Sequence, residues 1–181
     1  MMMGCLSQVR PMSGDPEEMQ LHVVIPGKLA GAVLGKDGAN VKGIATESGC
    51  RSILMTKREN NTADRRCVIL GKYSSCVAAQ QAVHALLTEA ATEQGGLEQL
   101  SELTVVYLVP KIAAGAVIGK AAANLKNIRE EAGVRKLDVA REEVEGQRPC
   151  TIVGPLDSVL AAEHMLQLEV QAVLMSEGEV W

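Results

Sequence analysis

An internal repeat is the feature that most constrains how this chain can fold. Residues 26–49, PGKLAGAVLGKDGANVKGIATESG, align without gaps on residues 110–133, PKIAAGAVIGKAAANLKNIREEAG. The match continues further along the chain, where RRCVILG at 65–71 corresponds to RPCTIVG at 148–154. A repeated unit of roughly 75 residues has the size of a small domain. We therefore predict two copies of one folding unit within the 181 residues.

Each unit predicts the same order of secondary structure. An apolar run, LHVVIP at 21–26 or LTVVYLVP at 103–110, has strand character and ends at a proline. Two short helical patterns follow, separated by a loop, and the second ends at Gly49 or Gly133, as helices often do. Two strands and a long amphipathic helix complete the unit. The order β-α-α-β-β-α predicts an α+β fold, with a three-stranded sheet packed against three helices in each unit.

Composition shifts suggest where the units begin and end. We expect a disordered lead-in over residues 1–19, a first domain over 20–93, a linker over 94–101, a second domain over 102–175 and a tail over 176–181. No apolar run reaches the roughly 18 residues that a membrane span needs. We therefore expect no membrane partner, and a location in the cytoplasm, the nucleus or both.

The composition also limits the chemistry. The five cysteines form no C-x-x-C pair and no zinc-type spacing with histidine, so we expect no metal site and no cofactor. Lys36 is followed by Asp37 and not by the Ser or Thr of the P-loop motif G-x-x-x-x-G-K-[ST], which binds nucleotide phosphates. No catalytic set of side chains stands out, which predicts a protein that is not an enzyme. The formal charge of −4 is uneven, because residues 20–97 carry +3 and residues 98–181 carry −5.

The stretch GKDG, residues 35–38, suggests a binding function for the first unit. Gly35 and Gly38 permit positive φ and leave no Cβ to block a close approach. The loop precedes a helix, whose first N–H groups lack partners within the helix and attract an anion. A phosphodiester strand could cross these amides beside Lys36, with its bases on a neighbouring aliphatic surface. Aromatic stacking platforms are scarce, since aromatic residues make up 2% of the chain.

The loop V-L-G-K-D-G between two helices of a β-α-α-β-β-α unit resembles that of the type I KH domain. The tandem arrangement and the continuation V-K-G-I-A-T-E-S-G are most similar to poly(C)-binding and Nova-like KH proteins. This resemblance implies a groove for about four nucleotides of single-stranded RNA or DNA, between the glycine loop and a variable loop. The variable loop of the first unit would be ENNTAD, residues 59–64. It also implies a role in post-transcriptional regulation of mRNA.

The resemblance also implies which residues of the first unit line the groove. Those around the loop are Gly31, Leu34, Gly35, Lys36, Asp37, Gly38 and Val41. On the following strand, family spacing alone would allow Ser52 and Leu54. The repeat favours Ile53 and Met55 instead, because they align with the alternating Leu137 and Val139. Candidates for base or phosphate contacts near the ends of this strand are Arg51, Lys57 and Arg58.

Two departures from the family pattern shape the functional prediction. Asp37 places a carboxylate beside the phosphate path, which weakens binding by about 1 kcal/mol on the scale of surface electrostatics. The equivalent positions of the second unit are Gly115, Ile118, Gly119, Lys120, Ala121, Ala122 and Leu125. An L-alanine at positive φ costs about 1 kcal/mol or more. We therefore expect the second loop to continue as helix and to close the phosphate cradle.

These observations predict that the first unit binds single-stranded RNA, pyrimidine-rich in sequence, with single-stranded DNA as a further possible partner. The alternative is a degenerate pair of units that serves as an interaction module. In that case the second unit would contact another protein or mediate self-association.

Overall fold

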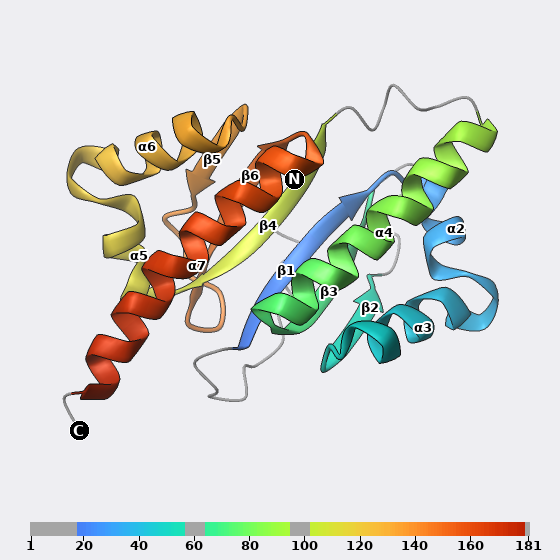
Figure 1. Cartoon of the computed structure of the whole chain (residues 1–181), viewed down its shortest axis with the longest axis horizontal. Coiled ribbons are helices and arrows are strands. Elements are labelled where there is room, and N and C mark those ends of the chain that lie inside the picture. Colours follow the sequence, from blue (N-terminus) through green and yellow to red (C-terminus); the bar gives the residue numbers. More distant parts are fainter. Residues whose placement is uncertain (1–17, 57–63, 95–101, 180–181) are drawn as a thin grey trace.

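The computed structural model describes residues 18–56, 64–94 and 102–179, with side chains up to residue 176 (Figure 1). The first domain comprises β1 (Glu18–Ile25), α2 (Ala30–Leu34), α3 (Ala39–Ser48), β2 (Ser52–Met55), β3 (Arg65–Lys72) and α4 (Tyr73–Gln94). The second comprises β4 (Leu103–Pro110), α5 (Lys111–Ile118), α6 (Ala123–Ala132), β5 (Lys136–Val139), β6 (Gln147–Gly154) and α7 (Leu156–Glu179). The predicted α+β class and the order β-α-α-β-β-α are confirmed in both domains.

The outer elements extend beyond the expected domain boundaries at residues 20 and 175. β1 begins at Glu18, and α7 continues to Glu179. The expected linker at 94–101 lies almost entirely outside the described residues, as does most of the expected lead-in. Among the helices of the described part of the chain, none combines the length and the apolar character needed to cross a bilayer.

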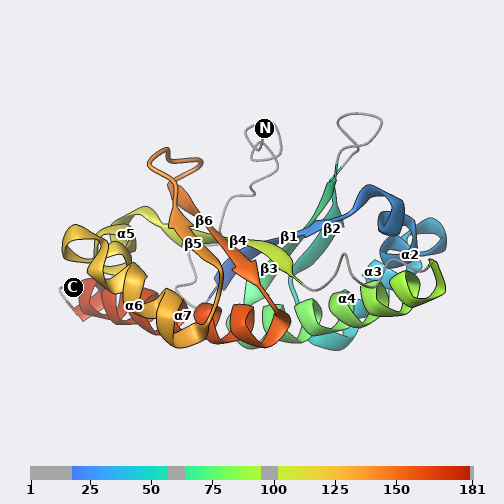
Figure 2. The same cartoon turned by 90° about the horizontal axis from the view of Figure 1, so that it is seen from above.

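The two three-stranded sheets join into one antiparallel sheet with the strand order β2-β3-β1-β4-β6-β5. The junction is the pairing of β1 with β4, in which Leu21 lies opposite Tyr107 and Val23 opposite Val105. β1 and β4 are apolar strands at the edges of their own three-stranded sheets, and their pairing leaves no unpaired N–H and C=O groups exposed along this stretch. All the helices lie on one side of the sheet, as Figure 2 shows from above.

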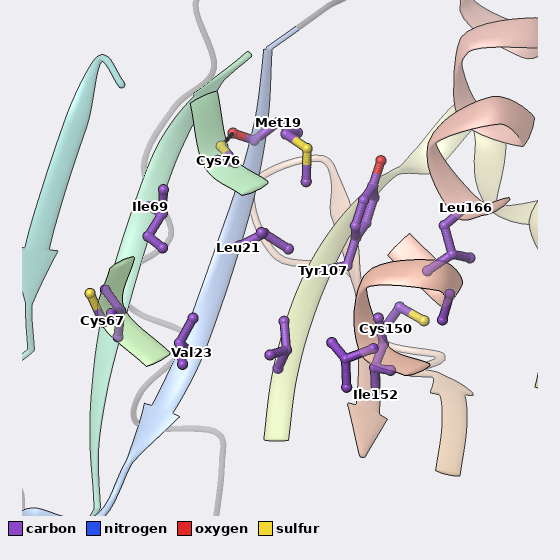
Figure 3. Packing of buried hydrophobic residues seen from close by; sticks show 14 of the residues in the cluster. Met19, Leu21, Val23, Cys67, Ile69, Cys76, Tyr107, Cys150, Ile152 and Leu166 are labelled. Atoms are coloured by element: carbon purple, nitrogen blue, oxygen red, sulfur yellow. Dashed lines mark hydrogen bonds between the residues drawn. The ribbon is translucent and has the colours of Figure 1, made fainter. Parts of the chain in front are cut away.

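A single hydrophobic core runs beneath both domains (Figure 3). Alternate residues of the central strands point toward the helices, among them Leu21 and Val23 of β1 and Tyr107 of β4, each at most 2% exposed. The C-terminal helices α4 and α7 contact each other across the junction. The two domains therefore share one core and one sheet. Separating them would expose the edges of β1 and β4 that pair at the junction.

The helix contact at the junction buries an acid. Glu163 of α7 is 0% exposed, and its counterpart in the first domain is Gln80 of α4, 1% exposed. Burial raises the pKa of the Glu163 carboxyl to about 8, against a smaller lowering by the Gln80 side chain. Tyr107 donates a hydrogen bond to Gln167 Oε1 of α7 at 2.5 Å in the same region. The carboxyl is thus largely protonated at neutral pH.

The opposite face of the sheet holds a buried histidine. His22 of β1 is 0% exposed, with Nε2 at 2.8 Å from Gln20 Nε2 and Nδ1 at 3.3 Å from Arg66 Nη1. Burial and, to a smaller extent, the charge of Arg66 lower the His22 pKa to about 3. The imidazole is therefore neutral at physiological pH and serves as part of the fold.

Candidate nucleic-acid interface

The GKDG stretch forms a tight, exposed turn between α2 and α3. Gly35 has φ 75° and ψ 175°, Asp37 has φ 56° and ψ 27°, and Gly38 has φ 75° and ψ 17°. The Gly35 N–H donates to the Gly31 carbonyl at 2.9 Å, and the Gly38 N–H donates to the Gly35 carbonyl at 3.2 Å. The side chains of Lys36 and Asp37 are exposed. The turn is neither wound into an α-helix nor covered by the second domain.

Asn40 of α3 holds this turn, and the sequence analysis did not assign it a role. Its side-chain Nδ2 donates to the Ala32 carbonyl at 2.9 Å, across the turn to the end of α2. Asn124 does the same in the second domain, with Val117 O at 2.9 Å and Ala116 O at 3.3 Å. The signal was present in the sequence, because the Ala-Asn pair after the loop is identical in both copies.

The two glycines of the turn have different tasks. A Cβ on Gly35 would lie 2.7 Å from Asn40 Cγ and 2.9 Å from the Asn40 backbone nitrogen, distances that real Cβ atoms do not show. A Cβ on Gly38 would meet nothing closer than Lys42 Cε at 3.9 Å. Gly35 is therefore needed for space and conformation, whereas Gly38 is needed for conformation alone.

The expectation that the second loop continues as helix is wrong. Helix α5 ends at Ile118, and Gly119 has φ 75° and ψ 172°, almost the same values as Gly35. Ala121 and Ala122 adopt φ 53° and 61°, so both alanines occupy the left-handed region. The hydrogen bonds of Asn124 hold the turn in this shape and override the helix propensity of the alanines. The phosphate cradle of the second domain is therefore open.

Strand β2 carries the two apolar residues that were expected to line the groove of the first domain. Ile53 and Met55 are half-buried and pack against the hydrophobic core. They pair with Ile69 and Cys67 of β3, so the alternation of the strand turns Ser52 and Leu54 to the other face of the sheet. The remaining predicted groove residues differ in exposure: Gly31 is exposed, Leu34 is half-buried and Val41 is 5% exposed.

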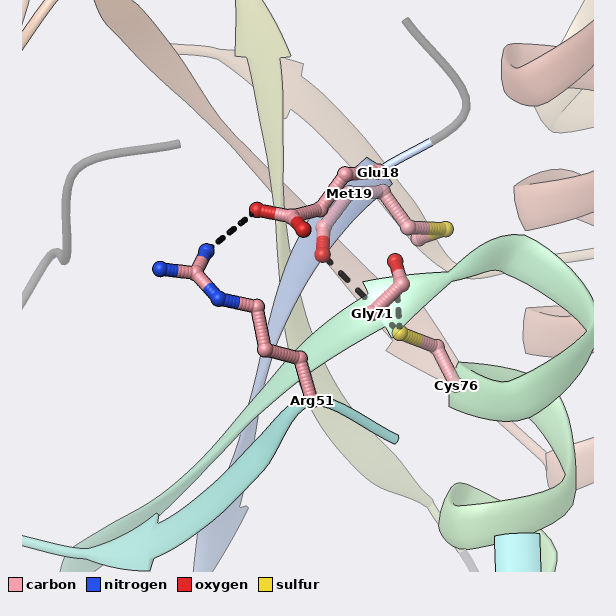
Figure 4. A network of polar contacts seen from close by, with 5 residues as sticks. All are labelled: Glu18, Met19, Arg51, Gly71 and Cys76. Atoms are coloured by element: carbon pink, nitrogen blue, oxygen red, sulfur yellow. Dashed lines mark hydrogen bonds and ion pairs between the residues drawn. The ribbon is translucent and has the colours of Figure 1, made fainter. Parts of the chain in front are cut away.

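Arg51 does not lie with the loop. It follows Gly49, the residue that ends α3, while the loop precedes the helix, so ten residues and about 15 Å of helix separate them. Its Nη1 pairs with Glu18 Oε1 of β1 at 2.6 Å (Figure 4). The second domain repeats this ion pair between Arg135 and Glu102 at 2.8 Å. Lys57 and Arg58, the other two predicted cationic contacts, lie outside the described residues.

Some exposed charges of the two domains can be compared. The side chain of Lys42 lies beside the first turn, because a Cβ on Gly38 would be 3.9 Å from Lys42 Cε. Lys42 is four residues after Gly38, and this helical spacing was a signal in the sequence that the two residues are neighbours. Lys126 is the second-domain counterpart of Lys42. The β5–β6 connection of the second domain carries exposed Glu142, Glu143 and Glu145, and Glu143 pairs with Lys111 Nζ at 3.2 Å.

A model of the KH domain matches this chain twice, over residues 20–85 and 104–168. The chain belongs to the KH-domain family. Together the two matches span most of the chain, and the resemblance to a tandem KH protein noted in the sequence is confirmed. This membership makes the chain a tandem-KH, nucleic-acid-binding protein, and it identifies the turn at 35–38 as the KH glycine loop. Among the described residues, no group of three or more His, Cys, Asp or Glu side chains could hold a metal ion.

Curated relatives share this similarity. Far upstream element-binding protein 1 of Homo sapiens is 28% identical over 164 residues, which cover 84% of this chain and 25% of that protein. Far upstream element-binding protein 2 of Homo sapiens is 29% identical over 144 residues, 75% of this chain and 20% of that protein. This KH chain therefore spans a quarter or less of the length of those relatives. Dim2p from Pyrococcus horikoshii OT3 is 16% identical with a TM-score of 0.31, covering 83% of this chain and 90% of that one.

Proposed function

We propose that the first KH domain binds single-stranded RNA, without catalysis, in the groove between the glycine loop and β2. The observation that carries this proposal is the open turn at residues 35–38 in front of α3, whose first residues have no side-chain cap. The uncapped N–H groups and the helix dipole favour a phosphate there. Lys36 and Lys42 add positive charge, and the half-buried side chains of Ile53 and Met55 offer an aliphatic seat for bases.

Charge supports the choice of the first domain over the second. The two turns have the same backbone shape, so the backbone does not distinguish them. The β5–β6 connection of the second domain presents exposed Glu142, Glu143 and Glu145, whose carboxylates repel a phosphodiester strand. Residues 98–181 carry a net charge of −5, whereas residues 20–97 carry +3. The stronger site is therefore expected in the first domain.

Three finer points complete the proposal. The preference for pyrimidine-rich RNA follows from the similarity of the loop and its continuation to poly(C)-binding and Nova-like proteins. Single-stranded DNA is a second ligand, because a groove that reads bases and phosphates does not by itself require the 2′-hydroxyl. Regulation of mRNA in the nucleus or the cytoplasm is the role that fits such binding.

The test uses the whole chain, because the two domains share a sheet. Binding of labelled C- or U-rich oligonucleotides is measured for Lys36→Asp and for the matched variant Lys120→Asp. We expect Lys36→Asp to abolish binding, because it reverses the charge at the proposed phosphate site, and Lys120→Asp to change the affinity by less than about twofold, which is under half a kcal/mol. Binding must also weaken as salt rises. A larger loss from Lys120→Asp would move the site to the second domain.

The second candidate function is protein contact through the second domain. Within the described residues, the large hydrophobic side chains that are most exposed are Ile112 at 59%, Leu168 at 58% and Met175 at 63%, and all three belong to this domain. Apolar side chains gathered on one domain favour an interaction surface. Sedimentation of the chain and of Leu168→Glu/Met175→Glu tests self-association. A monomer for both proteins at every concentration would dismiss self-association.

A further inference from the structure

Two thiols of the first domain lie against the segment that joins β3 to α4, residues 71–76. Cys50 directly follows Gly49, the residue that ends α3, and Cys76 lies in the first turn of α4. Cys50 Sγ donates to the Ser75 carbonyl at 3.2 Å. Cys76 Sγ donates to the Gly71 carbonyl at 3.5 Å, as Figure 4 shows. The two cysteines lie at the same short segment, because Ser75 directly precedes Cys76 and a Cβ on Gly71 would lie 3.6 Å from Cys50 Cβ.

The repeat shows that the fold does not require sulfur at these two positions. The positions of Cys50 and Cys76 correspond to Val134 and Val159 of the second domain. Both valines are core residues, 6% and 0% exposed. The surrounding geometry is also repeated, because a Cβ on Gly49 or on Gly133 would lie 3.5 Å from a serine Oγ in each case. The first domain thus carries thiols at two positions that hold buried valines in the second.

The two thiols differ in access and acidity. Cys50 is half-buried, whereas Cys76 is 0% exposed. The contact with Cys76 lowers the Cys50 pKa to about 7, opposed by burial and assisted by the Ser48 hydroxyl. Thiolates are the reactive form of cysteine. Burial raises the pKa of Cys67 and of Cys150 to about 12, so these thiols are unreactive by comparison.

We propose that Cys50 and Cys76 are a redox-sensitive pair that a peroxide converts into an intrachain disulfide. The Cys50 thiolate attacks one peroxide oxygen, the O–O bond breaks, and hydroxide leaves as Cys50 becomes a sulfenic acid. The Cys76 sulfur then attacks the Cys50 sulfur, the S–O bond breaks, and water leaves with the Cys76 proton. In total, two thiols are oxidised and one hydrogen peroxide is reduced to two waters. Cys76 needs no access to solvent, because Cys50 Sγ already lies 3.2 Å from the carbonyl oxygen of Ser75, the residue before Cys76.

The bond would tie the end of α3 to the start of α4. The glycine loop lies at the other end of α3, so oxidation leaves the loop in place. The expected change in oligonucleotide affinity is therefore less than about twofold, a difference worth under half a kcal/mol. The proposal stands independently of the RNA-binding proposal, since its readout is covalent.

The experiment treats the reduced full-length chain with hydrogen peroxide at neutral pH and maps disulfides by peptide mass. We expect a Cys50–Cys76 peptide pair that has lost two hydrogen atoms and that dithiothreitol releases. Cys50→Val and Cys76→Val, which install the residues of the second domain, should each abolish this pair. Cys67→Val is the matched control and should retain it. In Cys76→Val, a sulfenic acid should accumulate at Cys50 and react with dimedone.

Several outcomes would overturn the pair. The first concerns the reactivity of Cys50. If iodoacetamide alkylates Cys50 in the folded chain no faster than Cys150, the assigned reactivity is wrong. A peroxide product in which Cys50 joins Cys5, or a second chain, would show that Cys76 is not its partner. A disulfide that still contains Cys50 in Cys76→Val would have the same meaning.

Discussion

Separate substitution of the two glycines in the first KH loop tests how the turn is held. Gly35 has φ 75° and ψ 175°, a region that essentially only glycine occupies, and another residue there costs about 1–3 kcal/mol. A Cβ on Gly35 would also displace Asn40, whose bond to Ala32 is worth about 1 kcal/mol. We expect Gly35→Ala to lower the free energy of unfolding by about 4 kcal/mol, the upper strain cost plus the lost bond.

Gly38 presents a milder case. Its φ of 75° and ψ of 17° lie in the left-handed helical region, which costs an L-residue about 1–2 kcal/mol. The nearest atoms to a Cβ there, Lys42 Cε at 3.9 Å and Leu34 Cδ1 at 4.0 Å, are ordinary contacts. The smaller entropy of alanine in the unfolded chain offsets about 0.4–1 kcal/mol. Gly38→Ala should therefore lower the free energy of unfolding by about 1 kcal/mol.

Thermal unfolding followed by far-ultraviolet circular dichroism separates the two cases. For a chain of this size each kcal/mol shifts Tm by about 2–4 °C, so Gly38→Ala should lower Tm by about 3 °C and Gly35→Ala by about 12 °C. Gly119→Ala in the second domain is the matched control and should resemble Gly35→Ala. Equal losses at Gly35 and Gly38, or no loss at Gly119, would refute the steric reasoning.

Three further predictions concern the turns and the junction. Asp37→Lys should tighten oligonucleotide binding about fivefold, since it removes a repulsion of about 1 kcal/mol, and fluorescence anisotropy measures this. Asn40→Ala should cost about 1 kcal/mol in urea denaturation and weaken RNA binding, because the turn loses its bond to Ala32. Glu163 has a folded pKa of about 8, above the ordinary glutamate value of 4.5, so the folded state holds the proton more tightly. Wild-type stability should therefore fall relative to Glu163→Gln as pH rises, by about 2 kcal/mol between pH 6.5 and 8, in parallel urea titrations.

Local sequence signals predicted the order of elements because each signal acts over a few residues. The apolar runs that end at Pro26 and Pro110, and the helix ends at Gly49 and Gly133, were all readable without tertiary contacts. The joining of the sheets was not readable in this way. It depends on β1 meeting β4, an edge pairing between segments more than 80 residues apart, to which local periodicity gives no clue.

The site was predicted in part for the same reason. The glycine loop and the core-facing side of β2 follow from the motif and the repeat. Arg51 was placed near the groove from its sequence position, yet its partner Glu18 lies 33 residues earlier, and no local pattern shows that ion pair. Comparison of the copies does show it, because Arg135 and Glu102 keep the same spacing. Internal repeats thus carry tertiary information that a single copy lacks.

The two loops differ in sequence for a reason that the geometry explains. Gly35 and Gly119 are both kept because a Cβ at either would collide with the asparagine that closes the turn. Ala122 can replace the second glycine because the position is open and costs only left-handed strain. The loss of that glycine is therefore no sign that the second loop has lost its shape. If the two domains differ in RNA binding, the backbone of the turn does not account for the difference, and the acids of the β5–β6 connection are one charge difference that can be tested. Neutralising Glu142, Glu143 and Glu145 as Gln should then raise the RNA affinity of the chain and make it sensitive to Lys120→Asp, and unchanged affinity would contradict the electrostatic explanation.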